Sequence, residues 1–340
     1  MRQLPFQETN GRSTVNNGTR PTMADVARLA GVSPALVSIV MRGVPGASDA
    51  TRARIKSIAD SIGYVPDRRA QKLRQTTSRL LGVTFDLHQP FHGDLVEHIY
   101  SDADRHGYDV MLSAVAPSRS EDAAVRSLVR ERCEATILLG SDLDADHIAT
   151  LSSSIPAVTV MRRSGVDGVG SVRSDDVAGI GLAVDHLVEL GHRLIAHIDG
   201  GRAPGAHDRR TGFRDAMARH GLSDDAIVVK GGTTETDGSE AAARLMRTEP
   251  PTAIIAFNDL CATGVLDHLI RTGVPVPESV AVVGYDDSRL ADMAHVQLTS
   301  VSQDAASLAE AAVTTALAQV SGTPARDVVL TPRVVRRATT

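Results

Sequence analysis

The feature that most constrains the fold is the regular alternation, from residue 80 onward, of short apolar runs with amphipathic segments. The apolar runs are LLGVTF (80–85), DVMLSAV (109–115), ATILLG (135–140), AVTVM (157–161), LIAHID (194–199), AIVVKG (226–231), TAIIAF (252–257) and VAVVGY (280–285). Segments with helical spacing lie between them, namely 94–107, 177–191 and 260–273. Continuous apolar strands separated by helices are typical of parallel sheets covered by helices. We therefore predict an α/β body.

This body is too long for one typical open sheet, so the sequence predicts two lobes with a cleft between them. We expect a two-lobed domain over 79–340, with lobe 1 at about 79–176 plus 304–330 and lobe 2 at about 177–303 plus 331–340. In open α/β sheets, ligands bind beyond the carboxyl ends of the strands. A binding site is therefore expected at the strand ends, between the lobes.

The charge of the chain is divided unevenly along its length. The net charge of the 340 residues is −5, yet residues 20–74 hold ten Lys or Arg against four acidic residues. The first nineteen residues add one positive charge, so the remainder carries −12. A basic head on an acidic body indicates that the head meets a polyanion, although a solvated charged face gives the same composition. Residues 1–19, rich in Asn, Gly, Thr and Ser, are expected to form a disordered arm.

Helix start signals predict three short helices within the head, residues 20–64. Thr22 with Asp25 forms an approximate capping box for the first helix. Its expected inner face is Val26, Leu29 and Ala30.

Gly31 permits a tight turn, and Ser33 then caps a second helix that has Pro34 at its first position and runs to about Met41. A third helix is expected to start at Ser48 and to bury Ile55, Ile58 and Ile62. Two helices joined by a glycine turn and supported by a third are typical of a helix-turn-helix module. The following segment, YVPDRRAQKLR (64–74), is either a polar linker or a short helix that forms on contact with DNA.

The stretches TMADVARLAGVSPALVSIVMRG, SDATRARI and IGYVPDRRAQKL resemble the headpiece and hinge of LacI-type transcriptional regulators. The resemblance implies a headpiece at 20–64 and a hinge helix with linker at 65–78. It also implies that the second helix enters the major groove, while Leu73 of each subunit wedges into the minor groove with Ala70 close to its floor. An apolar wedge of this kind kinks the DNA.

The second helix is unusually apolar for a DNA-reading element. Relatives commonly carry polar or basic residues at the positions of Pro34, Ala35 and Ile39. Here Ala35 and Ile39 are expected to contact thymine methyl groups, while Ser33, Ser38 and Arg42 are left mainly for phosphates. The complete set expected at DNA is Thr22, Ser33, Pro34, Ala35, Leu36, Ser38, Ile39, Arg42, Arg52, Ala70 and Leu73.

In the body, polar residues stand where the predicted strands end. Asn258 follows one apolar run, Asp286 and Asp287 follow another, and Arg209 stands just ahead of a helix. The stretch VTFDLHQPFHGDL is expected to end its strand in Phe91 and His92. An Asp, an Asn and an Arg that converge on a cleft can hydrogen-bond hydroxyls or a carboxylate, although each alone is as readily a helix cap or a surface ion pair.

The C-terminal pattern GYDD…LTSVSQD…VLTPRVVRRATT resembles the effector-binding core of the same family, which shares its fold with periplasmic sugar-binding proteins. The resemblance implies effector contacts at Arg209, Asn258 and Asp286, with Phe91 and His92 from the first lobe. The family default is a sugar or sugar derivative. Two departures weaken that default, because Met161 replaces an acid and Ala305 replaces an aromatic residue found in some relatives.

An enzyme or a transport protein would have to use the same cleft. No G-x-S-x-G, P-loop or HExxH motif is present, and His92, His197 and His207 have no partner at diagnostic spacing. On these grounds we expect no catalytic residue and no cofactor. The two cysteines, Cys133 and Cys261, lie far apart, so we expect no metal site either. The absence of a signal sequence, of a long apolar run and of a disulfide framework favours a cytoplasmic, nucleoid-associated protein over a solute-binding protein.

The sequence therefore predicts a DNA-binding regulator, most readily a repressor, in which a homodimer binds a palindromic operator and a small effector changes its affinity. Inducer and corepressor both stay open.

Overall fold

The computed structural model describes residues 21–64, 77–247 and 250–340. The chain divides into two compact units, 1–77 and 78–340. Among the described residues no single helix is long and apolar enough to span a bilayer; the bent pair of the first two helices passes by length and composition only.

The headpiece contains three helices, α1 (Met23–Ala30), α2 (Pro34–Met41) and α3 (Asp49–Ser61). All three start signals are confirmed, since Thr22, Ser33 and Ser48 each accept a backbone hydrogen bond as the N-cap. The chain bends by 107° between α1 and α2, within the range of helix-turn-helix pairs.

The headpiece core differs from the prediction at one position on α1. Leu29 is 51% exposed, and Ala27 is buried instead. An eight-residue helix buries only a narrow stripe of side chains against its neighbours, and Leu29 lies outside that stripe. Ile55 and Ala59 of α3 are buried, whereas Ile58 and Ile62 are only partly buried against the same cluster. The buried members are Val26, Ala27, Ala30, Val37, Val40, Ile55 and Ala59.

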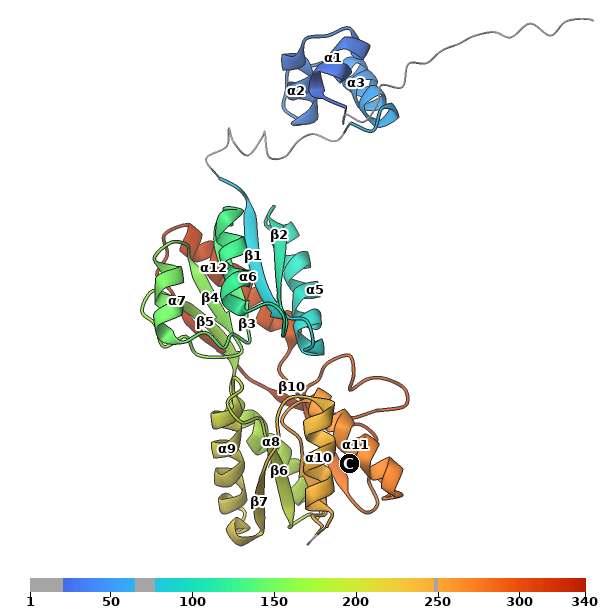
Figure 1. Cartoon of the computed structure of the whole chain (residues 1–340), viewed down its shortest axis with the longest axis vertical. Coiled ribbons are helices and arrows are strands. Elements are labelled where there is room, and N and C mark those ends of the chain that lie inside the picture. The colour runs from blue at the N-terminus through green and yellow to red at the C-terminus, as the bar shows by residue number, and fades with distance from the viewer. Residues whose placement is uncertain (1–20, 65–76, 248–249) are drawn as a thin grey trace, which may run out of the picture. The chain divides into compact units, whose positions relative to one another are not determined.

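Lobe 1 is built on a six-stranded sheet of order β11-β5-β4-β3-β1-β2, in which every pair is parallel. Its strands are β1 (Leu80–Asp86), β2 (Asp109–Val115), β3 (Ala135–Leu139), β4 (Ala157–Val160), β5 (Gly170–Ser174) and β11 (Asp327–Leu330). Its helices are α5 (Pro90–Arg105), α6 (Glu121–Arg130), α7 (Ala145–Ser152) and α12 (Ala305–Val320). Figure 1 shows α12, from the C-terminal part of the chain, in the same lobe as β1 to β5.

Lobe 2 has a second six-stranded sheet of order β12-β10-β9-β8-β6-β7. Its strands are β6 (Ile195–Asp199), β7 (Ala226–Lys230), β8 (Ala253–Ile255), β9 (Ala281–Asp286), β10 (Thr299–Ser302) and β12 (Arg333–Val335). Its helices are α8 (Asp176–Glu189), α9 (Ala206–Arg219), α10 (Glu235–Leu245) and α11 (Asp259–Thr272), with a 3-10 turn at Ser223–Asp225. The sheet is parallel except for β12, which runs antiparallel to β10, so the prediction of parallel sheets needs this one correction.

The eight predicted apolar runs all form strands, and four further strands lie outside them. These are β5, β10, β11 and β12, which read GSVRS, TSVS, DVVL and RVV. Each of these strands has only three to five residues and contains at least one polar side chain, so it gives no continuous apolar signal and the sequence pattern missed it. The chain crosses between the lobes after β5, after β10 and after β11, which places the strand ends of both sheets beside the crossings.

Candidate DNA-binding face and effector cleft

The N-terminal part of α2 is exposed in the headpiece unit. Ser33 accepts a hydrogen bond from the backbone N–H of Leu36 at 3.2 Å, which fixes the start of the helix. Ser33, Pro34 and Ala35 are exposed, while Leu36 packs partly against the core. The end of α2 expected to meet base edges therefore offers a small, mainly apolar surface.

The next turn of α2 is less open. Ser38 and Ile39 are half-buried, and the Nε of Arg42 donates to the Ser38 carbonyl at 3.2 Å. A side chain at Gly46 would place its Cβ 3.2 Å from Ile39, so the loop after α2 lies against that residue. Ile39 thus supports the loop as well as facing outward in part.

Thr22 and Arg52 both have structural partners within the headpiece. Thr22 forms a full capping box with Asp25. Arg52 donates from Nη2 to the Val44 carbonyl at 3.0 Å, which ties α3 to the loop that follows α2. Ala70 and Leu73, the expected hinge contacts, lie outside the described residues.

In the body, Arg209 lies at the centre of a buried ionic cluster. It is the fourth residue of α9 rather than a residue ahead of that helix, and it is 2% exposed. Its Nε donates to Oδ1 of Asp176 at 2.8 Å, and its Nη1 donates to the Phe257 carbonyl at 2.6 Å. Its guanidinium carbon lies 3.6 Å from the centre of the Tyr285 ring. These contacts fix the guanidinium plane in one orientation.

Asp286 stands on the other side of this guanidinium. It ends β9 with a positive φ of 109°, a conformation that non-glycine residues rarely adopt. Its Oδ1 lies 4.0 Å from Nη2 of Arg209 and accepts a hydrogen bond from Gln303 at 2.7 Å. Burial raises the pKa of Asp286 well above its ordinary value, and the nearby positive charge of Arg209 opposes that rise. Backbone strain and buried charged side chains are common at binding sites.

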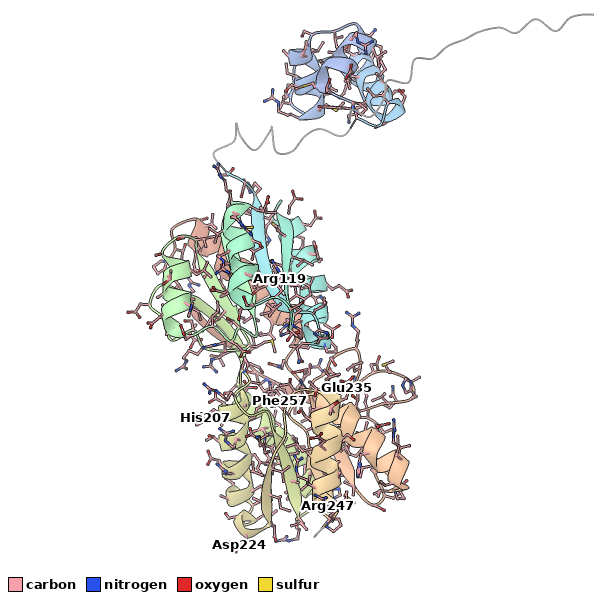
Figure 2. All side chains as sticks on the ribbon, viewed as in Figure 1. Arg119, His207, Asp224, Glu235, Arg247 and Phe257 are labelled. Carbon is pink, nitrogen blue, oxygen red and sulfur yellow. The ribbon has the colours of Figure 1, made fainter. Side chains whose placement is uncertain are left out.

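Asn258 connects this cluster to lobe 1. Its Oδ1 caps α11 by accepting from the N–H of Cys261 at 2.8 Å, which leaves its amide nitrogen to donate to Gln89 at 3.3 Å. Gln89, the N-cap of α5, also donates to Thr233 at 3.3 Å. One side chain of lobe 1 thus contacts two residues of lobe 2. Figure 2 shows Phe257, Glu235 and His207 at the end of lobe 2 that faces lobe 1, with Asp224 and Arg247 at the opposite end.

Asp259, which follows Asn258, belongs to the frame of lobe 2. Its carboxylate accepts from Ser300 Oγ at 2.6 Å and from the N–H and Oγ of Ser288 at 2.7 and 2.8 Å. Burial raises the pKa of Asp259 to about 7, although the three hydrogen bonds act to lower it. This carboxylate joins α11 to the segments around β9 and β10.

The expectation that the first strand ends in Phe91 and His92 is wrong. The strand β1 ends at Asp86, and both residues lie in the first turn of α5, where Pro90 takes the first helical position. Phe91 is 2% exposed and packs in the lobe 1 core. His92 is 4% exposed, and its Nδ1 accepts the backbone N–H of Asp86 at 2.9 Å. Burial lowers the pKa of His92 to about 4, so the ring is neutral at pH 7.

The structure thus brings Arg209, Asn258 and Asp286 to the strand ends of lobe 2, and turns Phe91 and His92 into lobe 1. The sequence reasoning missed Gln89 and Asp176. Asp176 gave only a helix-start signal, because the residue that it contacts lies 33 positions later in the chain. Gln89 precedes a proline at a helix start, a position that carries no information about a contact 169 residues away.

Comparison with known proteins agrees with this architecture. The description "Bacterial regulatory proteins, lacI family" matches residues 22–67, and "Periplasmic binding protein-like domain" matches residues 184–340. The chain is 31% identical over 325 residues to the HTH-type transcriptional regulator GalR of Escherichia coli (strain K12), covering 93% of this chain and 94% of GalR.

Two solved structures extend the comparison. A LacI transcriptional regulator from a Rhodococcus species is 65% identical, with a TM-score of 0.76, over 77% of this chain and 98% of that one. The lac repressor dimer bound to operator and the anti-inducer ONPF is 27% identical, with a TM-score of 0.79, over 95% and 99% of the two chains. With a helix-turn-helix headpiece and a two-lobed α/β body in one polypeptide, this chain belongs to the lacI family of bacterial DNA-binding transcriptional regulators.

Proposed function

We propose that this regulator is a repressor that binds a palindromic operator as a homodimer and responds to a small molecule held between its lobes. The lac repressor structure, similar over 95% of this chain, is a dimer bound to operator and to an anti-inducer. The observation that carries the proposal is the cluster of Arg209, Asn258 and Asp286 at the strand ends that face lobe 1.

We assign the parts of the chain accordingly. Residues 1–19 form an N-terminal arm, 20–64 the DNA-binding headpiece, 65–78 the hinge, and 79–340 the effector-binding and dimerisation domain. On the DNA side, the exposed start of α2 with Ser33, Pro34 and Ala35 reads the major groove, and Arg42 and Arg52 contact phosphates after leaving their carbonyl partners. Ala70 and Leu73 act in the minor groove.

A ligand bound in the cleft changes the DNA affinity of the headpiece by changing the arrangement of the two lobes. Gln89 contacts Asn258 and Thr233 across the lobes, so a ligand that touches Asn258 competes with or reinforces that contact. The effect on DNA affinity equals the difference in ligand affinity between the two lobe arrangements, typically about 1–3 kcal/mol. Phe91 and His92 shape the lobe 1 wall, and lobe 2 supplies the polar contacts of Arg209, Asn258 and Asp286.

We favour a regulator without catalytic activity. The neighbouring carboxylates Asp286 and Asp287 have different partners, because Asp286 contacts Gln303 whereas Asp287 binds Arg337 at 2.7 Å. Paired general acid and base groups need a common reacting centre. A solute-binding role is the less favoured alternative, because it leaves the headpiece without a use.

The proposal is tested by selecting DNA sites with the full chain and measuring affinity, stoichiometry and salt dependence. We expect two chains on a palindromic site and an affinity that falls steeply with salt. Arg209→Met should leave that basal binding intact and abolish the response to any metabolite that changes it in the wild type. Selection of asymmetric sites, or binding of one chain, would contradict the proposal.

A further inference from the structure

A polar cavity of about 280 Å³ opens between the lobes beside the Arg209 cluster. Lobe 1 contributes Met161 and Arg162 after β4, with Arg173 from β5, and lobe 2 contributes the segment from Arg202 to Asp208 after β6. These segments follow or end parallel strands, where α/β proteins bind ligands. The cavity therefore belongs to the proposed effector cleft.

Arginine dominates the lining. Its positively charged residues are Arg162, Arg163, Arg173 and Arg202. Arg162 is held in place, because its Nη1 donates to the carbonyls of Ser141 and Leu143 at 2.6 and 3.1 Å. A guanidinium fixed by backbone carbonyls keeps its remaining N–H groups in a set direction.

Arg173 lacks a full set of partners. Its side chain is 14% exposed, and its buried Nε has no hydrogen-bond partner among the described residues. The Asp327 carboxylate lies 3.8 Å from its Nη2 and 3.6 Å from Nε of Arg163, beyond normal hydrogen-bond length. A buried N–H without a hydrogen-bond partner calls for an acceptor. Arg173 lines the cavity, so a ligand held there would supply one.

The acidic groups in the lining do not cancel these charges. They are Asp142, Asp176 and Asp208. Asp176 is already bound by Arg209, while Asp327 lies within 4 Å of Arg163 and Arg173, which leaves four guanidinium groups against the three carboxylates Asp142, Asp208 and Asp327. The cavity also receives the start of α9, whose N-cap Gly205 offers no side-chain acceptor to the first N–H groups. Helix N-termini attract anions, and one arginine can donate two parallel hydrogen bonds to a phosphate or carboxylate.

Gly205 makes this geometry possible. It adopts a φ of +80°, and a Cβ at this position would lie 2.7 Å from Oδ2 of Asp176. A larger residue would push the start of α9 away from the Asp176–Arg209 ion pair and would occupy space in the cavity.

On this basis, and resting on the effector cleft of the proposed function, we propose that the effector is an anionic polyol. Its phosphate or carboxylate group lies among Arg162, Arg173 and Arg202, and its hydroxyl groups lie on Arg209, Asn258 and Asp286. The scarcity of aromatic residues, 3% of the chain with no tryptophan, fits recognition by charge rather than by ring stacking.

The first test is a titration of the full chain with inorganic phosphate at constant ionic strength. Calorimetry measures the binding, and the unfolding temperature measures the stabilisation. We expect saturable binding that weakens at least tenfold in Arg173→Gln and again in Arg202→Gln. The matched control is Arg219→Gln, which removes an exposed arginine of α9 outside the cavity and should leave binding unchanged. Absence of saturable binding, or equal binding in all four proteins, would overturn the proposal.

A competition experiment then separates the two anion sources. Neutral hexoses, their 6-phosphates and their aldonic acids are added to the phosphate-loaded chain. Displacement by the 6-phosphates assigns a phosphate, and displacement by the acids assigns a carboxylate. Equal displacement by neutral hexoses, or none by any charged sugar, would overturn the anionic polyol. Operator binding of the same samples without phosphate shows separately whether the proposed function holds.

Discussion

Nε of Arg209 lies 2.8 Å from Oδ1 of Asp176, and the two side chains are 3% and 5% exposed. An ion pair this deeply buried costs much free energy to form, but removing one partner costs more because a charge is left alone. The pair also joins the start of α9 to the start of α8.

We expect Asp176→Asn to lower the free energy of unfolding by about 3–5 kcal/mol, because Arg209 then keeps a buried charge without its carboxylate. The double variant Asp176→Asn/Arg209→Met should lose less than the two single changes together. Urea unfolding of the four proteins measures this coupling.

The matched control is an exposed ion pair of similar length. Arg271 and Asp267 on α11 lie 2.7 Å apart but are 76% and 49% exposed. Asp267→Asn should change stability by less than about 1 kcal/mol. Equal losses at Asp176 and Asp267 would show that burial does not set the cost.

The sequence predicted the elements of this site better than its contacts. Asn258 and Asp286 lie at strand ends as expected, because apolar runs mark a strand and polar residues mark its end. The orientation of Phe91 did not follow, since the Pro90 that starts α5 shifts this residue from a strand end to a core-facing helix turn. Periodicity over a few residues does not reveal such a shift.

Long-range pairing was beyond the sequence for a different reason. Asp94 of α5 accepts from the backbone N–H and Nε of Arg289 at 3.1 and 2.6 Å, 195 residues apart, and nothing local marks either residue. The three crossings between the lobes set this proximity. A single sequence carries no signal for contacts that arise only when two lobes meet.

Acid should destabilise lobe 2 through His197. This residue is fully buried on β6, with Nδ1 3.1 Å from the Ile255 carbonyl and no partner for Nε2 among the described residues. Burial lowers the pKa of His197 from 6.5 to about 4. The unfolded chain therefore binds more protons than the folded one between pH 6.5 and 4.

The sign follows from that difference. The stability contributed by a neutral buried histidine is present above pH 6.5 and is lost as the pH falls toward 4, by about 3 kcal/mol in all. Between pH 7.5 and pH 5 the wild type should therefore lose stability relative to His197→Leu, because leucine takes up no proton on unfolding. His295→Leu changes an exposed histidine and should leave the pH dependence as it is. If the free energy of unfolding of His197→Leu and of the wild type changed equally with pH, this assignment would be contradicted.

The hinge wedge makes a prediction about DNA shape. Leu73→Ala removes the apolar group proposed to enter the minor groove, so we expect smaller DNA bending and operator affinity reduced by about tenfold. Fluorescence transfer between dyes at the two ends of an operator fragment measures the bend. The unfolding temperature of the full chain should not change, which separates loss of the wedge from loss of folding. Unchanged bending would show that the wedge assignment is wrong.

The apolar start of α2 makes a prediction about base recognition. Pro34 and Ala35 are exposed and carry no hydrogen-bonding side-chain group, so thymine methyl groups are the base features that they can contact. Replacing a thymine beneath α2 by deoxyuridine removes only that methyl group and should weaken binding by about three- to tenfold, the cost of about one lost methyl contact. The same replacement outside the half-sites is the control. Ala35→Ser should make the protein insensitive to the deoxyuridine replacement, because a hydroxyl gains nothing from the methyl group. Equal affinity for thymine and deoxyuridine operators, or strong protection of guanine N7 beneath Pro34 and Ala35, would show that α2 reads its site through other contacts.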